Sequence, residues 1–150
     1  MIIDTIQAAV TAFQVDSIPF YSYGTWIDEA NRLTLLNDII SKQDQKFPLV
    51  FLLLDFDENY IETENSFESN LRLFIINRTA DTANAERRHT DEMPTLRTIE
   101  TNLLKYLKLY NIRFSDYSRT ERFYAENQLN VPVNTIELEI PAIYQINCLT

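Results

Sequence analysis

Glycine is almost absent from this chain, since Gly24 is the only one among 150 residues. Phosphate-cradling loops and dinucleotide-binding turns need several glycines, because their backbone must approach the ligand closely. The sequence also has no Gly-x-Ser-x-Gly elbow and no His-x-x-x-His or paired-cysteine spacing for zinc. We therefore expect neither a nucleotide-dependent enzyme nor any catalytic activity, and no cofactor.

Cysteine and long apolar runs are equally scarce. With Cys148 alone, no intramolecular disulfide can form, which favours a reducing compartment. The longest uninterrupted apolar run covers only residues 49–54, and the N-terminus lacks the pattern of a signal peptide. We expect a protein that is neither exported nor membrane-spanning.

Positive charge is also in short supply, with 13 basic against 22 acidic residues and a formal net charge of −9. This balance repels phosphate backbones and anionic headgroups, so tight nucleic-acid binding and membrane binding are not expected. DNA can still pass nearby, because a channel through which DNA slides benefits from walls that do not grip it.

Apolar residues, by contrast, make up 45% of the chain and aromatic residues 12%. This composition and length are typical of one folded domain that buries a substantial core without disulfides or metals. No internal repeat or flexible linker interrupts the sequence. Residues 1–150 are therefore predicted to form a single α+β domain.

The first half of the chain predicts one helix, followed by strands. An apolar stripe at spacings of three and four predicts an amphipathic helix that ends near Gln14. Residues 20–23 predict a short strand or loop, and residues 26–42 are interpreted as a helix. The run 47–54 is apolar on both faces, as in a central strand covered on each side. Residues 71–76 predict its antiparallel neighbour, reached through a long exposed loop.

The second half is predicted to contain the longest helix and the clearest strand. Residues 93–110 carry a helical apolar stripe, and Pro94 either begins this helix or kinks a longer one. Short strands are expected at 112–114 and 122–125, with a turn at 116–119. A strand is predicted to begin at Val133, because the apolar residues at 136, 138, 140, 142, 144 and 146 share one parity while polar residues at 135, 137, 139 and 145 face the other way. One face of this strand is therefore expected to be buried and the other exposed. Pro141 cannot donate to a ladder, so this strand is expected at an edge or bulged there.

Together these patterns predict a mixed, mostly antiparallel sheet packed by an N-terminal helix and a long central helix. Two groups of residues are candidates for contacts with other subunits. The possible subunit-interface residues are aromatic, basic or at the predicted edge: Tyr21, Tyr23, Trp26, Arg78, Arg87, Arg88 and Pro141. The second group is an acidic loop: Asp57, Glu58, Glu62, Glu64 and Glu68.

The acidic group and the single histidine have plainer interpretations as well. Calcium loops need a glycine for their sharp turn, and none lies near the acidic residues, so a solvated acidic loop is favoured over a metal site. His89 sits in a strongly polar stretch, which is typical of an exposed, charged helix face rather than of a catalytic dyad. The aromatic residues around Trp26 suit a core as well as an interface.

Beyond the amphipathic start, five stretches have a characteristic order: FYSYGTWIDEANRL, KFPLVFLLLDF, LRLFIINRT, ANAERRHTDEMPTLRTIETNLLKYL and DYSRTERFYAENQLNVPVNTIELEI. From about residue 3 to residue 140, this pattern resembles a family of small structural proteins of Bacteroides-type tailed phages and prophages. It is similar in this respect to tail-terminator and neck-ring proteins. No single diagnostic motif carries the resemblance.

The resemblance implies a virion subunit at the neck or head–tail junction. Such families form hexameric or dodecameric rings with a DNA channel on the axis, so the implied partners are copies of the chain and other neck, portal or tail proteins. In such a ring we expect the acidic loop to face the channel or an adjoining ring. The family has no catalytic motif, so no catalytic residue is transferred.

Two other functions remain open from the residues alone. The first is a metal-dependent nuclease or hydrolase that uses Asp55, Asp57 and Glu62, which would have to converge on Mg²⁺. The second is an acidic module that mimics DNA and occupies the basic groove of a host protein. Only the net charge supports this second alternative.

Overall fold

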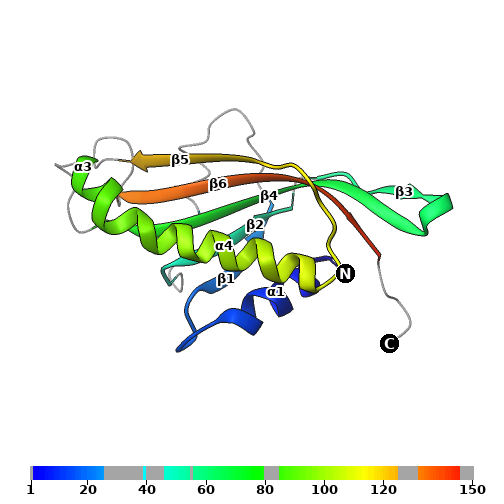
Figure 1. Cartoon of the computed structure of the whole chain (residues 1–150), viewed down its shortest axis with the longest axis horizontal. Helices are drawn as coiled ribbons and strands as arrows, with labels where there is room; N and C mark the ends of the chain where they lie inside the picture. The colour runs from blue at the N-terminus through cyan, green and yellow to red at the C-terminus, as the bar shows by residue number, and fades with distance from the viewer. Residues whose placement is uncertain are drawn as a thin grey trace.

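A computed structural model describes residues 2–25, 39, 46–54, 56–79, 85–124 and 132–145. It has an α+β fold built on one mixed sheet, with helices packed on it (Figure 1). In chain order the elements are α1 (Ile2–Phe13), β1 (Phe20–Gly24), β2 (Leu49–Leu53), β3 (Asn59–Ile61), the 3-10 turn η1 (Glu62–Glu64), β4 (Ser66–Arg78), α3 (Ala85–Arg87), the π-helical turn η2 (Arg88–Glu92), α4 (Met93–Leu109), β5 (Ser118–Tyr124) and β6 (Val133–Tyr144).

The sheet runs in the order β1-β2-β4-β6-β5, and β3 pairs with β4 outside this path. Among the described strands, β1 and β2 pair in parallel, and the four other strand pairs are antiparallel. The prediction of a mixed, mostly antiparallel sheet packed by the two helices is therefore confirmed.

The pairing of β4 with β6 forms the middle of the sheet. Twelve consecutive residue pairs join the two strands, from Phe67 opposite Tyr144 to Arg78 opposite Val133. Because side chains alternate along a strand, this register places Leu73 and Leu138 on the same face. A slip by one residue would turn the apolar set of either strand towards the opposite face.

Helices α1 and α4 cover that face (Figure 1). Residues at helical spacing are buried on both helices, among them Ile6 and Val10 on α1 and Leu96 and Leu103 on α4. They pack into one cluster with the inward residues of β2, β4 and β6, as the apolar stripes predict. In the described part of the chain, no helix is both long and apolar enough to cross a membrane.

Strand β2 is buried on both faces, as its unbroken apolar run predicts. Val50 and Leu52 belong to the cluster beneath the helices, while Phe51 joins a second cluster on the opposite face. Ile39 is buried in this second cluster. Otherwise the helix interpreted for residues 26–42 lies outside the described residues.

The prediction of a long exposed loop between β2 and β4 is wrong. Residues 59–61 form β3, which pairs with residues 66–68 of β4, and η1 closes the hairpin. The sequence of this hairpin resembles that of a loop, because most of its side chains are polar and are exposed on both faces of the strands.

The later strands also differ from the predictions. Residues 112–114 contribute only an isolated bridge between Arg113 and Ile143. Strand β5 begins at Ser118, inside the predicted turn at 116–119. Pro94 lies in the first turn of α4, directly after the π-helical turn that joins it to α3. A proline has no N–H to donate to the preceding turn, and π-helical turns are one way to absorb that loss.

Pro141 predicted that β6 lies at an edge or is bulged there, but β6 is not an edge strand and its register with β4 runs unbroken through Asn70 and Pro141. It lies between β4 and β5. The ladder with β5 ends at the pair Ser118 and Glu139, and Pro141 comes two residues beyond that pair. The N–H group of Ile143 donates to the Arg113 carbonyl oxygen, on the β5 side of the strand. Backbone groups of alternate residues point to the same side, so the Pro141 nitrogen also points to the β5 side. It lies past the end of the ladder with β5, where no donor is needed.

Truncation of a buried leucine on α4 tests the packing of this helix. We expect Leu103→Ala to lower the free energy of unfolding by about 2–5 kcal/mol, because it leaves a cavity beneath the sheet. Leu103 is fully buried, whereas Leu109 on the same helix is 61% exposed. Leu109→Ala is the matched control and should change stability by less than about 0.5 kcal/mol. Urea unfolding measures both, and equal effects would contradict the packing of α4.

Candidate functional site

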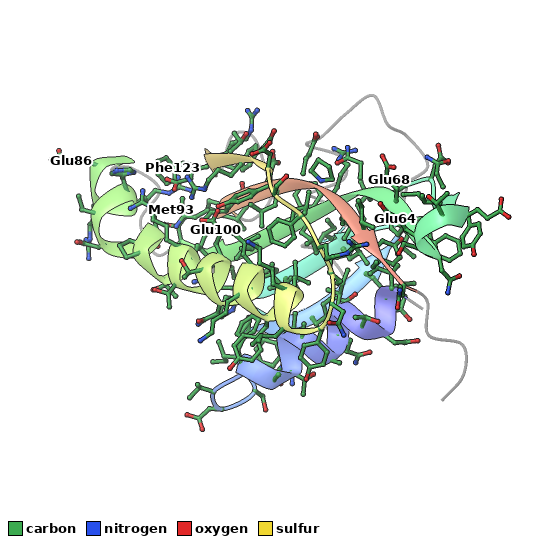
Figure 2. All side chains as sticks on the ribbon, turned by 45° about the vertical axis from the view of Figure 1, so that its right-hand side comes forward. Glu64, Glu68, Glu86, Met93, Glu100 and Phe123 are labelled. Carbon is green, nitrogen blue, oxygen red and sulfur yellow. The ribbon has the colours of Figure 1, made fainter. Side chains whose placement is uncertain are left out.

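The five acidic candidates lie on one projecting hairpin, formed by residues 57–68 and called here the acidic hairpin (Figure 2). It extends β4 beyond β2, and Asn59 and Glu68 are register partners within it. Its turn closes where the Asn65 amide donates to the carbonyl oxygen of Glu62. All five carboxylate residues are exposed, so their predicted solvation is confirmed.

Aromatic contacts fix the acidic hairpin to the sheet. The ring of Phe67 lies 5.2 Å from that of Tyr60 and 6.4 Å from that of Tyr144 on β6, centroid to centroid. The Tyr144 hydroxyl donates to Glu58 at 2.9 Å, and burial raises its pKa. Tyr60 remains 55% exposed. The hairpin thus presents carboxylates and one aromatic ring on a packed base.

The acidic side chains of the described residues do not form a metal centre. No group of three or more metal-ligating side chains occurs among them. Glu64 pairs instead with Arg113 at 3.5 Å, and Glu58 accepts from Tyr144. Asp55, which the nuclease hypothesis requires, lies outside the described residues.

A basic, aromatic surface lies at the other end of β4. Lys46, Phe47 and Arg78 line a groove of about 520 Å³ together with Ile18, Phe20 and Asn77, called here the cationic groove. The Arg78 guanidinium sits 4.9 Å from the Phe47 ring centroid, and Lys46 Nζ sits 5.7 Å from that of Phe20.

The sheet register brings these residues together. Phe20 on β1 pairs with Leu49 on β2, and Leu49 pairs with Ile76 on β4. The starts of β1 and β2 therefore meet the end of β4. At about 3.3 Å per residue, the two ends of the 13-residue β4, Ser66 in the acidic hairpin and Arg78 in the groove, lie roughly 40 Å apart.

Arg88 is not an interface residue, and this prediction is wrong. It is 2% exposed. Its Nε donates to Asn134 Oδ1 at 2.7 Å, and Nη2 donates to the carbonyl oxygens of Val133 and Tyr124 at 2.7 and 3.0 Å. Arg88 thus ties the π-helical turn to the adjacent ends of β5 and β6.

The other interface candidates are divided between core and surface. Tyr21 packs against the helix-covered cluster and its hydroxyl donates to the Ile3 carbonyl oxygen, while burial raises its pKa. Tyr23 is 48% exposed on the edge strand β1. Arg87 is exposed and pairs with Asp91 at 3.6 Å, and Pro141 is exposed beside Asn70. Trp26 lies outside the described residues.

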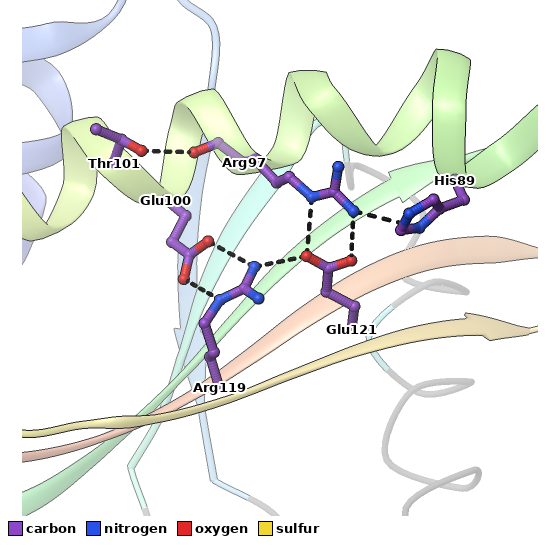
Figure 3. Close-up of polar contacts among 6 residues, drawn as sticks. All are labelled: His89, Arg97, Glu100, Thr101, Arg119 and Glu121. Carbon is purple, nitrogen blue, oxygen red and sulfur yellow. Dashed lines mark hydrogen bonds and ion pairs between the residues drawn. The ribbon is translucent and has the colours of Figure 1, made fainter.

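A network of ion pairs joins α4 to β5 (Figure 3). Arg97 binds both carboxylate oxygens of Glu121, at 2.8 and 2.9 Å. Arg119 binds both oxygens of Glu100, at 2.6 and 2.8 Å, and also reaches Glu121 at 2.6 Å. Bidentate pairs of this kind hold the edge strand against the helix with defined geometry.

The same network is unsuited to proton transfer near neutral pH. Hydrogen bonds from Arg97 and then from Arg119 lower the pKa of Glu121 to about 2. His89 is exposed, as predicted, and its Nδ1 lies 3.2 Å from Arg97 Nη2. A carboxylate held by two guanidinium groups stabilises the fold and is a poor general base.

Sequence reasoning missed both the ion-pair network and the cationic groove. The sequence does show that each element carries an arginine and a glutamate on one face. Arg97 and Glu100 are three residues apart on a helix, and Arg119 and Glu121 are two residues apart on a strand. Lys46 directly precedes the apolar run at 47–54, and nothing in that run marks it as part of a surface with Arg78. Residue spacing within one element does not reveal which other element will pack against it.

Comparison with known protein families and with curated proteins finds no match to the chain. The fold class therefore comes from the structure itself.

Replacement of Arg88 tests its role as a buried tie. Arg88→Met keeps an apolar stem but leaves two strand carbonyls and Asn134 without this donor, so we expect the free energy of unfolding to fall by about 1–3 kcal/mol. The exposed neighbour supplies the control, since Arg87→Met removes a surface pair with Asp91 that is worth about 0.5 kcal/mol. Urea denaturation of both variants gives the comparison. A harmless Arg88→Met would argue against the tie.

The ion-pair network predicts a pH dependence. The folded-state pKa of Glu121 lies below its ordinary value of 4.5, so its contribution to stability is present above that value and is lost as pH falls towards 2. We expect Glu121→Gln to be less stable than the wild type at pH 7, with a smaller loss on acidification. Urea midpoints at about pH 7, 4.5 and 2.5 test this. Glu68→Gln, on the acidic hairpin, should keep the wild-type profile.

Proposed function

We propose that the chain is a structural subunit of a tailed-phage virion that assembles with copies of itself into a ring at the neck or head–tail junction. The sequence pattern supports this function through its resemblance to tail-terminator and neck-ring proteins. The α+β fold agrees with the architecture that the resemblance implies. In this proposal the protein acts by assembly and catalyses no reaction.

One observation carries the proposal: the two ends of β4 present different surfaces. The acidic hairpin projects at one end, and the cationic groove lies at the other. Closed rings with more than two subunits need head-to-tail contacts, in which two unlike patches of the same chain meet. An elongated subunit with unlike ends satisfies this requirement.

The sheet edges offer further contact surfaces. Within the described residues, no strand pairs with the outer edge of β1 or of β5. An open strand edge carries unpaired backbone groups that another chain can complete. Tyr23 on β1 is an exposed aromatic side chain of the kind enriched at interfaces.

The net charge of −9 is compatible with a DNA channel. A ring of like-charged subunits repels the phosphate backbone and lets DNA slide without tight binding. The proposed partners are other copies, in a hexamer or dodecamer, and the neighbouring neck, portal or tail proteins.

The mass of the purified protein in solution tests the proposal. We expect light scattering over a concentration series to give a discrete six-fold or twelve-fold multiple of the 17.6 kDa chain. Mass spectrometry of phage particles from the encoding strain should detect the chain as a stoichiometric component.

A monomer at every concentration that is also absent from particles would overturn the proposal. If such a monomer captured a basic nucleic-acid-binding protein of the host, and nucleic acid displaced it, the DNA-mimic function would replace the ring. Heat on titration with Mg²⁺ or Mn²⁺, together with nuclease activity, would support the hydrolase hypothesis instead.

A further inference from the structure

We propose that the acidic hairpin of one copy docks into the cationic groove of a second copy, and that this contact is the head-to-tail joint of the assembly. The inference rests on the proposed function and specifies which surfaces meet. The occupant of the groove is thus the turn that carries Glu62 and Glu64.

The groove has the chemistry to receive such a turn. Lys46 and Arg78 are exposed, and each lies over an aromatic ring that holds its charge at the groove. The lining also includes Ile18, which is 43% exposed. Two cations beside an apolar surface favour an occupant that combines carboxylates with an exposed apolar side chain.

The acidic hairpin supplies that combination. From Asp55 to Ser69 the sequence contains no lysine or arginine, while Glu62 and Glu64 occupy the closing turn. Glu64 also forms an exposed pair with Arg113 of its own chain at 3.5 Å, so docking exchanges that partner for the groove cations. Tyr60 is 55% exposed next to this turn, and its hydroxyl donates to Asn65 at 2.7 Å. Figure 2 shows Glu64 and Glu68 at one end of the molecule and Glu86 and Phe123 at the other.

Placement on opposite ends keeps a copy from filling its own groove. The two ends of β4 lie roughly 40 Å apart, so the hairpin of one copy reaches only the groove of another. If each copy donates its hairpin to one neighbour and accepts that of another, the contact repeats until the rotation between copies closes a ring. Two copies that exchange hairpins with each other would form a dimer instead, and the mass in solution distinguishes the two.

The overall charge of the subunits opposes the contact at long range. Two chains of charge −9 repel each other, but at about 0.15 M salt the screening length is only about 8 Å. Repulsion between distant charges is then weak, whereas carboxylates in direct contact with Lys46 and Arg78 are screened less. Association at physiological ionic strength is therefore the condition to measure.

Charge reversal on each side of the joint gives the test. Variant one carries Glu62→Lys and Glu64→Lys, and variant two carries Lys46→Glu and Arg78→Glu. Each variant alone sets like charges against each other, so we expect the midpoint concentration of assembly to rise about tenfold or more. In an equimolar mixture every joint is complementary if the two variants alternate, so assembly should return with an even number of copies.

A matched control changes the same charge elsewhere. Lys105 on α4 is exposed and, like the groove cations, lies over an aromatic ring. The single variant Lys105→Glu should assemble at the wild-type concentration, whereas the single variant Arg78→Glu should raise the midpoint concentration of assembly. Circular dichroism melting confirms that every variant is folded.

The outcomes separate this inference from the proposed function. A wild type that forms rings, with both variants assembling normally alone, would falsify the joint and leave the ring in place. Failure of the mixed variants to assemble would also count against the joint. A monomeric wild type whose groove binds inorganic phosphate or an oligonucleotide, with loss of binding on Arg78→Glu, would assign the groove to phosphate and overturn the self-contact.

Discussion

The twelve-residue pairing of β4 with β6 is the constraint on which the rest of the structure depends. Its register turns one face of both strands towards α1 and α4, where the larger buried cluster forms. The same pairing runs on to Phe67 and Tyr144, so it also supports the base of the acidic hairpin. At its other end it places Arg78 and Val133 opposite each other, beside the cationic groove and the buried Arg88.

Polar interactions secure the elements that hydrophobic burial alone would leave loosely placed. Strand β5 is an edge strand with mostly exposed side chains, so it contributes little apolar surface. Two bidentate arginine–glutamate pairs, Arg97 with Glu121 and Arg119 with Glu100, hold it against α4. Arg88 ties the end of the same strand to β6 through backbone carbonyl oxygens. The sheet edge is therefore ordered by directional contacts.

The proposed assembly depends on the same pair of strands. The acidic hairpin and the cationic groove lie at the two ends of β4, and this continuous strand holds them at a fixed distance from each other. In the proposed assembly, a locally cationic groove on an acidic chain accepts the acidic hairpin of a neighbouring copy. In this proposal, self-recognition and the passage of DNA follow from one charge pattern.

The sequence by itself determined the elements whose periodicity reflects burial. Alternation in β6, the doubly buried run of β2 and the helical stripe of α4 each report which side chains avoid water, and that preference is local. The β3–β4 hairpin was missed because exposed strands lack such a pattern. Only the tertiary structure decided that Arg88 is buried, that Arg97 and Arg119 share Glu121, and that Lys46 meets Arg78. These contacts join residues distant in sequence, so they depend on which strands become neighbours, a choice that no single segment encodes.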